Sequence, residues 1–186
     1  DAKYFMQQLL KEDIPNYIDW WNRCQQAKVI LEGYDDTDGN KLMDKISQLL
    51  PYNPVVTVDI GQTVCWAAQS LWLRGTKGRI IIGGSYGAMG IGLPYAIGAS
   101  ISNNKGVVYC ITGDGGLQMN IQELETVKRE KLPIKILVVN NRELGKISEI
   151  QHGSYGDRYC ITTAESGYTV PDFEKIATAY GIKAST

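Results

Sequence analysis

The sequence has no hydrophobic run of membrane-spanning length, no excess of one charge and no closely spaced pair of cysteines. Its 186 residues carry 19 Lys and Arg against 20 Asp and Glu, a formal net charge of −1. A balanced charge gives no electrostatic footprint for nucleic acid or an anionic membrane. The longest apolar stretches are far shorter than the roughly 20 residues of a membrane helix, and no signal peptide is visible. We therefore expect neither nucleic acid nor a membrane as a partner.

Cysteine and histidine chemistry has little support either. None of the four cysteines stands in a C-x-x-C pair, which argues against a zinc site. Cys65 and Cys110 lie in apolar stretches typical of buried, inert thiols. The single histidine, His152, has no neighbouring nucleophile for a Ser-His-Asp or Cys-His mechanism. Unpaired cysteines are typical of a reducing compartment, so the expected localisation is cytoplasmic.

Residues 1–50 differ from the rest of the chain in composition and in the spacing of their apolar residues. They are polar and show helical spacing of apolar residues, which predicts a helical linker segment. The chain begins at Asp1 and ends at Thr186, directly after the start of a predicted strand. We therefore expect the sequence to be part of a longer protein, with residues 51–186 forming one truncated or fragmentary domain.

In residues 51–186, short β-branched runs alternate with helical patterns. The predicted strands are Val55–Asp59, Arg79–Ile82, Val107–Thr112, Ile134–Val139 and a fifth beginning at Lys183–Thr186. The predicted helices run through Trp66 and Leu71, Pro94–Ser100, Gln118–Lys131 and Pro171–Tyr180, with a loop at residues 152–169. Strands that alternate with helices predict an α/β fold, with a parallel sheet covered by helices on both faces.

Polar or glycine residues follow each of the first four predicted strands. These segments are Asp59-Ile60-Gly61-Gln62, Gly83-Gly84, Gly113-Asp114-Gly115 and Asn140-Asn141. Ligands of open α/β sheets bind outside the carboxyl ends of the strands. We therefore expect these segments to form a polar crevice that is rich in backbone groups.

Asp114 and Asn141 end neighbouring strands of one predicted βαβ unit, so both side chains can reach one cation. Mg²⁺ prefers such oxygen donors and usually shares them with phosphates. The Gly115 and Gly116 amides, at the start of the next helix, favour an anion. The pattern predicts a diphosphate bound through a divalent cation. Two ordinary turns are the alternative, and a dinucleotide site is disfavoured because no G-x-G-x-x-G follows the first strand.

These residues resemble a known family. The signature from Gly113-Asp114-Gly115 to Asn140-Asn141 is similar to that of thiamine diphosphate-dependent enzymes, which begins GDG and ends NN. The stretches DIGQTVCWAAQ, GGSYGAMGIGLPYAIGA and ELGKISEIQ resemble the C-terminal domain of acetolactate synthase large subunits. The resemblance implies the thiamin diphosphate-binding fold, with residues 1–50 similar to the tail of a preceding central domain. It is dense over residues 55–151.

The resemblance also implies roles for individual residues. Asp114 and Asn141 match the side-chain ligands of Mg²⁺, and Glu143 matches the residue that supplies a backbone carbonyl to it. The diphosphate would be held at positions matching Gln62, Thr63, Gly115 and Gly116. Gly87 matches the residue whose carbonyl faces the aminopyrimidine amino group. Met89 matches the bulky residue that enforces the bent form of thiamine diphosphate.

The family's activating glutamate has no counterpart here. The resemblance places it on a pyrimidine-binding domain of the same protein, contributed by a second subunit of a homodimer or tetramer. We therefore expect a 2-oxo acid carboligase, decarboxylase or lyase, with a transferase or lyase activity that this segment alone lacks. Lys146 and Ile150 stand where the synthases tend to carry methionine and tryptophan, which leaves the substrate open. A non-catalytic regulatory module and a Rossmann-like nucleotide domain are the alternatives.

Overall fold

A computed structural model of the chain describes residues 2–9, 11, 17–32, 37–84 and 86–186. The chain divides into two compact units, Asp1–Asp36 and Thr37–Thr186. The first unit contains the helices α1 (Ala2–Leu9) and α2 (Ile18–Glu32), in agreement with the helical pattern of the N-terminal residues. In the described ranges, no helix is both long and apolar enough to cross a membrane.

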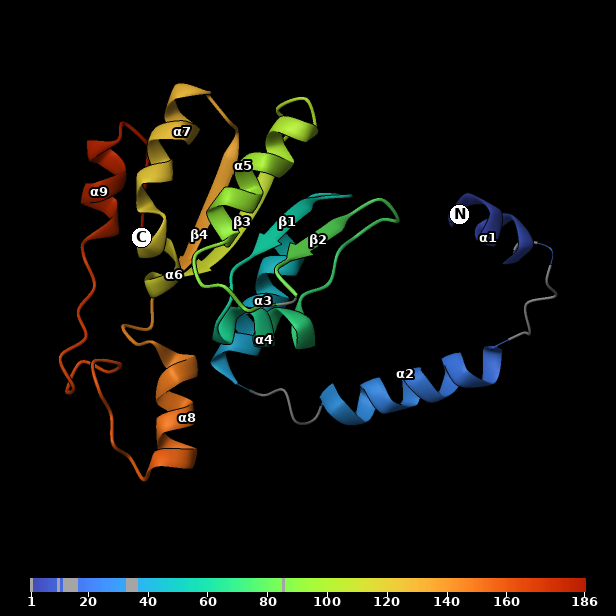
Figure 1. Cartoon of the computed structure of the whole chain (residues 1–186), viewed down its shortest axis with the longest axis horizontal. Coiled ribbons are helices and arrows are strands. Elements are labelled where there is room, and N and C mark those ends of the chain that lie inside the picture. The colour runs from blue at the N-terminus through green and yellow to red at the C-terminus, as the bar shows by residue number, and fades with distance from the viewer. Residues whose placement is uncertain (1, 10, 12–16, 33–36, 85) are drawn as a thin grey trace. The chain divides into compact units, whose positions relative to one another are not determined.

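The second unit is built around a four-stranded sheet in the order β2-β1-β3-β4, with every pair of neighbours parallel (Figure 1). The strands are β1 (Val55–Val58), β2 (Arg79–Ile82), β3 (Val108–Gly113) and β4 (Ile134–Val139). All four lie where the sequence predicts them, β2 and β4 with the predicted bounds. The parallel sheet with its surrounding helices confirms the α/β fold class.

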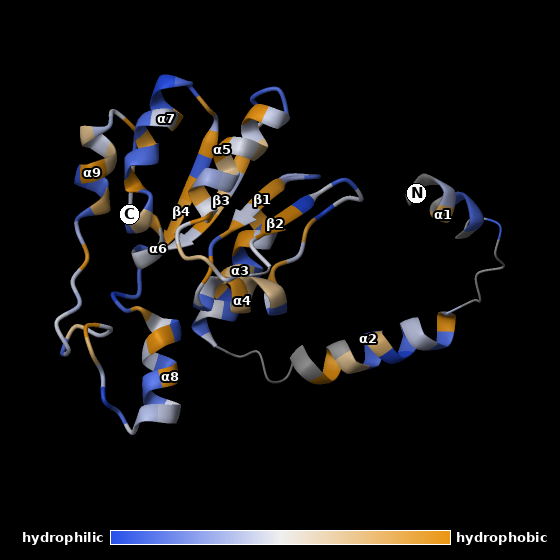
Figure 2. Ribbon diagram, in the orientation of Figure 1, coloured by the Kyte–Doolittle hydropathy of each residue, from blue (hydrophilic) through white to orange (hydrophobic). Residues whose placement is uncertain are grey.

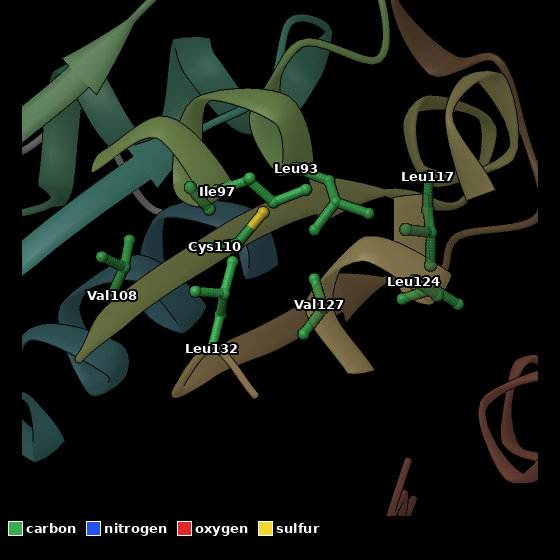
Figure 3. Packing of buried hydrophobic residues seen from close by; sticks show 9 residues of the cluster. Leu93, Ile97, Val108, Cys110, Leu117, Leu124, Val127 and Leu132 are labelled. Carbon is green, nitrogen blue, oxygen red and sulfur yellow. The ribbon is translucent and has the colours of Figure 1, made fainter. Parts of the chain in front are cut away.

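The strands bury residues in two separate hydrophobic clusters, one on each face of the sheet. Val56, Val58 and Ile111 are fully buried in one cluster. Val108 and Cys110 are fully buried in the other (Figure 3). Successive side chains of a strand point to opposite faces, so a continuous apolar run fills both. The prediction that Cys110 is buried is confirmed, and this burial raises the pKa of its thiol to about 12.

Helices cover both faces. The cluster around Val56 includes α3 (Asp38–Leu49) and α4 (Gln62–Ser70), whereas α5 (Gly92–Ser102), α7 (Leu124–Arg129) and α9 (Phe173–Ala179) pack in the cluster around Cys110. In Figure 2 the strands are mostly hydrophobic, while the helices mix hydrophobic and hydrophilic residues. The prediction of a buried Cys65 is wrong. This residue is two positions from the buried Thr63 and Ala67 of α4, and so lies on another face of the helix.

Helix α3 belongs to the second unit, although the sequence placed the domain boundary at residues 50 and 51. Its Met43 and Ile46 are buried in the cluster that contains β1. The side chain of Thr37 accepts the N–H of Asn40 and caps the start of the helix. The apolar face of this amphipathic helix covers the sheet. The boundary between the two structural units therefore lies earlier, between Asp36 and Thr37.

The segment after β3 is not the single helix predicted for Gln118–Lys131. Helix α6 begins earlier, at Asp114, and ends at Met119, and a 3₁₀ turn η1 (Ile121–Glu123) separates it from α7. Asn120 lies at the break with non-helical backbone angles. Its side-chain amide donates to the carbonyl of Gly90 at 2.7 Å, a tertiary contact that the periodicity does not reveal.

Two predictions for the C-terminal part are also wrong. Residues 152–155 do not lie in a loop, because helix α8 (Gly145–Tyr155) continues to Gly156, which ends it with a left-handed conformation. Residues 183–186 do not form a fifth strand, and the sheet of the described residues has four strands. The predicted last helix is confirmed as α9, which Asp172 caps by accepting the N–H of Lys175.

The connections set the position of the site. Helix α4 leaves β1 on one face of the sheet, and α6 and α7 leave β3 on the opposite face. The chain therefore diverges at the carboxyl ends of the adjacent strands β1 and β3. In doubly wound sheets this divergence opens the crevice in which ligands bind.

Candidate functional site

A cavity of about 290 Å³ opens at the carboxyl ends of the strands. Its wall is made by residues that follow β1, β2, β3 and β4, together with the first turn of α8. This volume is near the lower end of the range for small-molecule sites, roughly 300–1,000 Å³. The wall contains every residue that the sequence proposes for a cofactor or a metal: Gln62, Thr63, Gly87, Met89, Asp114, Gly115, Gly116, Asn141 and Glu143.

Several glycines leave bare backbone in this wall. An ideal Cβ atom on Gly61 or Gly113 would meet no other atom within 4 Å, and one on Gly87 would meet only Ile60, at 3.9 Å. Gly61 and Gly87 have φ angles of 128° and 61°, which residues with side chains rarely adopt. These glycines therefore let a ligand approach the N–H and C=O groups of the main chain.

Asp114 is the buried carboxylate of the wall, only 2% exposed. One of its oxygens accepts the N–H of Gly115 at 2.6 Å, and the other accepts the N–H of Arg142 at 2.8 Å. The hydroxyl of Tyr168 donates a longer bond of 3.4 Å. Burial raises the pKa of Asp114 above its usual range, and these bonds offset part of the rise. No ion pair to this carboxylate occurs among the described residues, so a bound cation would compensate its burial.

Asn141 contributes to the wall from the end of β4. Its Oδ1 accepts the N–H of Glu143 at 3.1 Å, and its Nδ2 donates to Oε1 of Gln62 at 3.1 Å. A Cβ atom on Gly145 would lie 2.1 Å from Oε1 of Gln62 and 3.0 Å from Nδ2 of Asn141. The lack of a side chain at Gly145 therefore makes room for the bond that ties the end of β4 to the start of α4.

Three helices begin in the wall without a side-chain cap: α4 at Gln62, α6 at Asp114 and α8 at Gly145. The first N–H groups of a helix have no intrahelical acceptor and carry partial positive charge, so they favour an anion. Thr63 also lies in the wall, but its hydroxyl donates to the carbonyl of Asp59 at 3.0 Å. The role of Thr63 as a phosphate donor stays a prediction.

Met89 and Leu144 pack closely on the backbone of α6. A Cβ atom on Gly115 would lie 2.7 Å from Cε of Met89 and 2.5 Å from Cδ2 of Leu144. On Gly116 it would lie 2.5 Å from Oδ2 of Asp59. Packing therefore requires glycine at position 116, next to the bonded pair Asp59 and Thr112. A side chain at position 115, by contrast, would displace the ends of Met89 and Leu144.

A match to known proteins decides what kind of domain carries this cavity. Residues 59–186 match the family described as "Thiamine pyrophosphate enzyme, C-terminal TPP binding domain", and all the residues that line the cavity lie in this range. The chain belongs to this family. Thiamine pyrophosphate is the same compound as thiamine diphosphate, so the family resemblance stated from the sequence is confirmed, and with it the class of cofactor.

Individual members of the thiamine pyrophosphate family are similar over most of the chain. The acetolactate synthase large subunit of Pyropia yezoensis is 37% identical over 186 residues, which is 96% of this chain and 31% of that protein. The isozyme 2 large subunit of Escherichia coli (strain K12) is 37% identical over 172 residues, 90% of this chain and 31% of that protein. The large subunit of Porphyra purpurea is 43% identical over 130 residues, 70% and 21% of the two chains. This chain thus spans about a third or less of these relatives.

The oxygen donors of this thiamine pyrophosphate domain fit a divalent cation that shares its ligands with a diphosphate. Asp114 offers a carboxylate and Asn141 an amide carbonyl, both hard donors of the kind that Mg²⁺ prefers. No group of three or more His, Cys, Asp or Glu side chains that could hold a metal occurs in the described part of the chain. A metal at this site would therefore need further oxygens from the main chain, the ligand or water.

The sequence predicts Asp59 only as part of a strand-end segment that lines the crevice, but Asp59 lies outside the cavity wall, and the sequence predicts no role for Tyr168. Asp59 follows β1 as Asp114 follows β3, so its position at a strand end was a usable signal. Tyr168 lies in an irregular segment and reaches Asp114 only through the tertiary fold. Burial and the neighbouring Asp114 raise the pKa of Tyr168 to about 12, so its hydroxyl keeps its proton and remains a donor.

Proposed function

We propose that the cavity binds thiamine diphosphate together with Mg²⁺, in the C-terminal cofactor domain of a 2-oxo acid carboligase, decarboxylase or lyase similar to the acetolactate synthases. The observation that carries this proposal is the convergence of nine residues, selected by the sequence pattern or by the family resemblance, on one cavity at the ends of the strands. Family membership supports the thiamine diphosphate half of the proposal. The chemistry of the oxygen donors supports the metal half.

The metal end of the site would be formed by the segments after β3 and β4. Mg²⁺ would be held by the side chains of Asp114 and Asn141 and by the backbone carbonyl of Glu143. The diphosphate would lie beside the metal, against the amides of Gly115 and Gly116. Asp114 alone would repel a diphosphate, and a metal between the two makes the arrangement attractive.

The segments after β1 and β2 would hold the rest of the cofactor. Gln62 and Thr63 are proposed to contact the phosphates at the start of α4, where the uncapped N–H groups favour an anion. The carbonyl of Gly87 would accept from the aminopyrimidine, and Met89 would support the bent form of the cofactor. When bound, thiamine diphosphate supplies the nucleophilic carbon that adds to 2-oxo acids and stabilises the resulting negative charge.

The activating glutamate is proposed to come from a pyrimidine-binding domain of a second subunit, in a cytoplasmic homodimer or tetramer. Glu143 does not meet this need, because it lies at the proposed metal end of the cavity, after β4. We propose that the 186-residue chain alone has no carboligase or decarboxylase activity. Measurable turnover of pyruvate by the purified chain, with thiamine diphosphate and Mg²⁺ present, would overturn this part of the proposal.

Titration calorimetry tests the binding itself. The chain is titrated with thiamine diphosphate in Mg²⁺, with thiamine diphosphate in EDTA, and with NAD in Mg²⁺. We expect heat of binding only in the first titration, because the carboxylate end of the site needs the metal. Equal affinity for thiamine diphosphate in Mg²⁺ and in EDTA would contradict the proposed metal site. Binding of NAD instead of thiamine diphosphate would favour a nucleotide-binding domain.

A further inference from the structure

Gly90 is held at both of its backbone groups. Its N–H donates to Oδ1 of Asp59 at 2.9 Å, and its carbonyl accepts from Nδ2 of Asn120 at 2.7 Å. The residue is buried and has a φ angle of 88°. A Cβ atom here would lie 2.5 Å from Cβ of Met119, so only glycine fits. Gly90 therefore fixes the place where the chain coming from β2 enters α5.

Asp59 connects three segments at this point. It is 1% exposed and follows β1. Its Oδ1 also accepts the N–H of Ile60 at 2.8 Å, and its Oδ2 accepts the hydroxyl of Thr112, at the end of β3, at 2.8 Å. One carboxylate thus joins the end of β1, the segment that leads into α5 and the end of β3.

These bonds satisfy Asp59 without a cation and without a ligand. All three donors are neutral groups of the protein, and Asp59 does not line the cavity. The neighbouring Met89 does line it, and so does Gly87. Asp59 therefore reaches Gly87 and Met89 through its bond to Gly90.

We propose that Asp59 is a positioning residue, which holds residues 86–91 in the conformation that presents Gly87 and Met89 to the cofactor. The identity of the ligand that Gly87 and Met89 face rests on the proposed function. The bond by which Asp59 holds the segment does not. Apart from the bond from Asn120 to Gly90 and the packing of Met89 on α6, the segment has little support, since Tyr86 is 99% exposed and Met89 is 37% exposed. Ordering it only upon binding would cost backbone conformational entropy, and ordering it in advance removes that cost from binding.

Two substitutions at Asp59 separate positioning from charge. Asp59→Ala removes the acceptor of the Gly90 N–H. Asp59→Asn keeps it: its Oδ1 still accepts from Ile60 and Gly90, and its Nδ2 donates to the hydroxyl of Thr112. That hydroxyl can turn to the carbonyl of Gly113, which already lies 3.2 Å away. The conservative variant is thus expected to rescue the segment.

Thr57→Val is the matched control. Thr57 is fully buried in β1, two residues before Asp59, and its hydroxyl donates at 3.0 Å to the carbonyl of Gly92, the first residue of α5. Its loss removes a buried hydrogen bond close to Asp59 but leaves Gly90 in place. It therefore reports the effect of lost stability alone.

Amide hydrogen exchange of the ligand-free chain is the first measurement. In Asp59→Ala we expect the exchange rate in residues 86–91 to rise at least tenfold more than the rate in β3. In Asp59→Asn and in Thr57→Val we expect the rates in these two regions to rise equally. If Asp59→Ala does not fold, Asn120→Ala frees the other end of Gly90 and should give the same local rise. A rise that is uniform over the chain, or none in residues 86–91, overturns the positioning role.

Calorimetry with thiamine diphosphate and Mg²⁺ is the second measurement. Asp59→Ala should weaken binding about tenfold, and Asp59→Asn should bind like the wild type. Equal affinity of Asp59→Ala and the wild type overturns the link from Asp59 to the cofactor. If the wild type itself does not bind while the local exchange effect is present, the proposed function fails and the hold of Asp59 on residues 86–91 stands.

Discussion

The ends of β1 and β3 carry two aspartates that are almost equally buried and differently partnered. Asp59, after β1, is 1% exposed, and Asp114, after β3, is 2% exposed. Asp59 accepts bonds from three segments of the protein and lies outside the cavity. Asp114 accepts bonds from Gly115, Arg142 and Tyr168, and lies in the cavity wall.

The comparison teaches that burial alone does not identify a ligand-binding carboxylate. Both carboxylate oxygens of Asp59 accept hydrogen bonds from the protein itself. Burial raises the pKa of Asp114, so its charged form is disfavoured until a cation arrives. A buried carboxylate in a cavity with such a perturbed pKa is typical of a functional site. The division between a binding and a positioning aspartate leads to the following predictions.

Asp114→Ala should have the largest effect on binding. The Mg²⁺-dependent affinity for thiamine diphosphate should fall about 100-fold or more, because removing one partner of a buried charge pair costs about 3–5 kcal/mol. Calorimetry with and without Mg²⁺ measures the change. Asp157→Ala, which removes an exposed aspartate paired with His152, is the control and should bind normally. Retained Mg²⁺ dependence in Asp114→Ala would show that the metal lies elsewhere.

The sequence predicts the binding aspartate better than the positioning one. The β-branched run before Gly113 shows that Asp114 ends a strand, and Asn141 ends the next, so parallel pairing brings them to one edge. The partners of Asp59 are Gly90 and Thr112, far along the chain and on other segments. No periodicity or spacing encodes these bonds.

The same distinction between local pattern and tertiary contacts explains which secondary-structure predictions are wrong. β2 and β4 are short apolar runs whose bounds follow from their composition. The helix predicted for Gln118–Lys131 is broken because Asn120 bonds to Gly90, which helical propensity does not reveal. Residues 183–186 resemble the start of a strand, but they pair with no strand in the sheet of the described residues. Local pattern thus predicts the elements, and tertiary contacts decide where they stop.

Gly115→Ala should have the next largest effect, about tenfold on affinity. The new Cβ atom would lie 2.7 Å from Cε of Met89 and 2.5 Å from Cδ2 of Leu144, so both side chains must shift within the cavity wall. Gly98→Ala is the matched control, because a Cβ atom there meets nothing within 4 Å. It should stabilise α5 by about 0.5–1 kcal/mol without changing binding. Equal affinities of the two variants would show that this wall does not contact the cofactor.

Acidification should weaken binding severalfold in the wild type. The raised pKa means that Asp114 takes up a proton at a higher pH than an ordinary aspartate, and Mg²⁺ requires the ionised form. Affinity should therefore fall as the pH is lowered towards that pKa. For the metal-free chain the sign reverses: the folded state binds this proton more tightly, so the contribution of Asp114 to stability improves as the pH falls through the same interval. Calorimetry at several pH values measures the first effect, and a binding affinity independent of pH would contradict it.

Tyr168→Phe should have the smallest effect, about twofold to threefold on affinity. It removes a long bond of 3.4 Å to Asp114 and leaves the bonds from Gly115 and Arg142 in place. Tyr159→Phe, at an exposed tyrosine that donates to Asp157, is the control and should bind like the wild type. A loss as large as that of Asp114→Ala would make Tyr168 part of the binding site rather than its support.

The most direct test is a crystal structure of the chain grown with thiamine diphosphate and Mn²⁺, a heavier substitute for Mg²⁺ with a measurable anomalous signal. We expect one anomalous peak between the side-chain oxygens of Asp114 and Asn141, at about 2.0–2.3 Å from each, with the diphosphate as a further ligand. Asp59 should keep its bonds to Gly90 and Thr112 and stay away from the metal. A peak at Asp59 or outside the cavity, or a diphosphate bound with no peak, would contradict the division between the two aspartates.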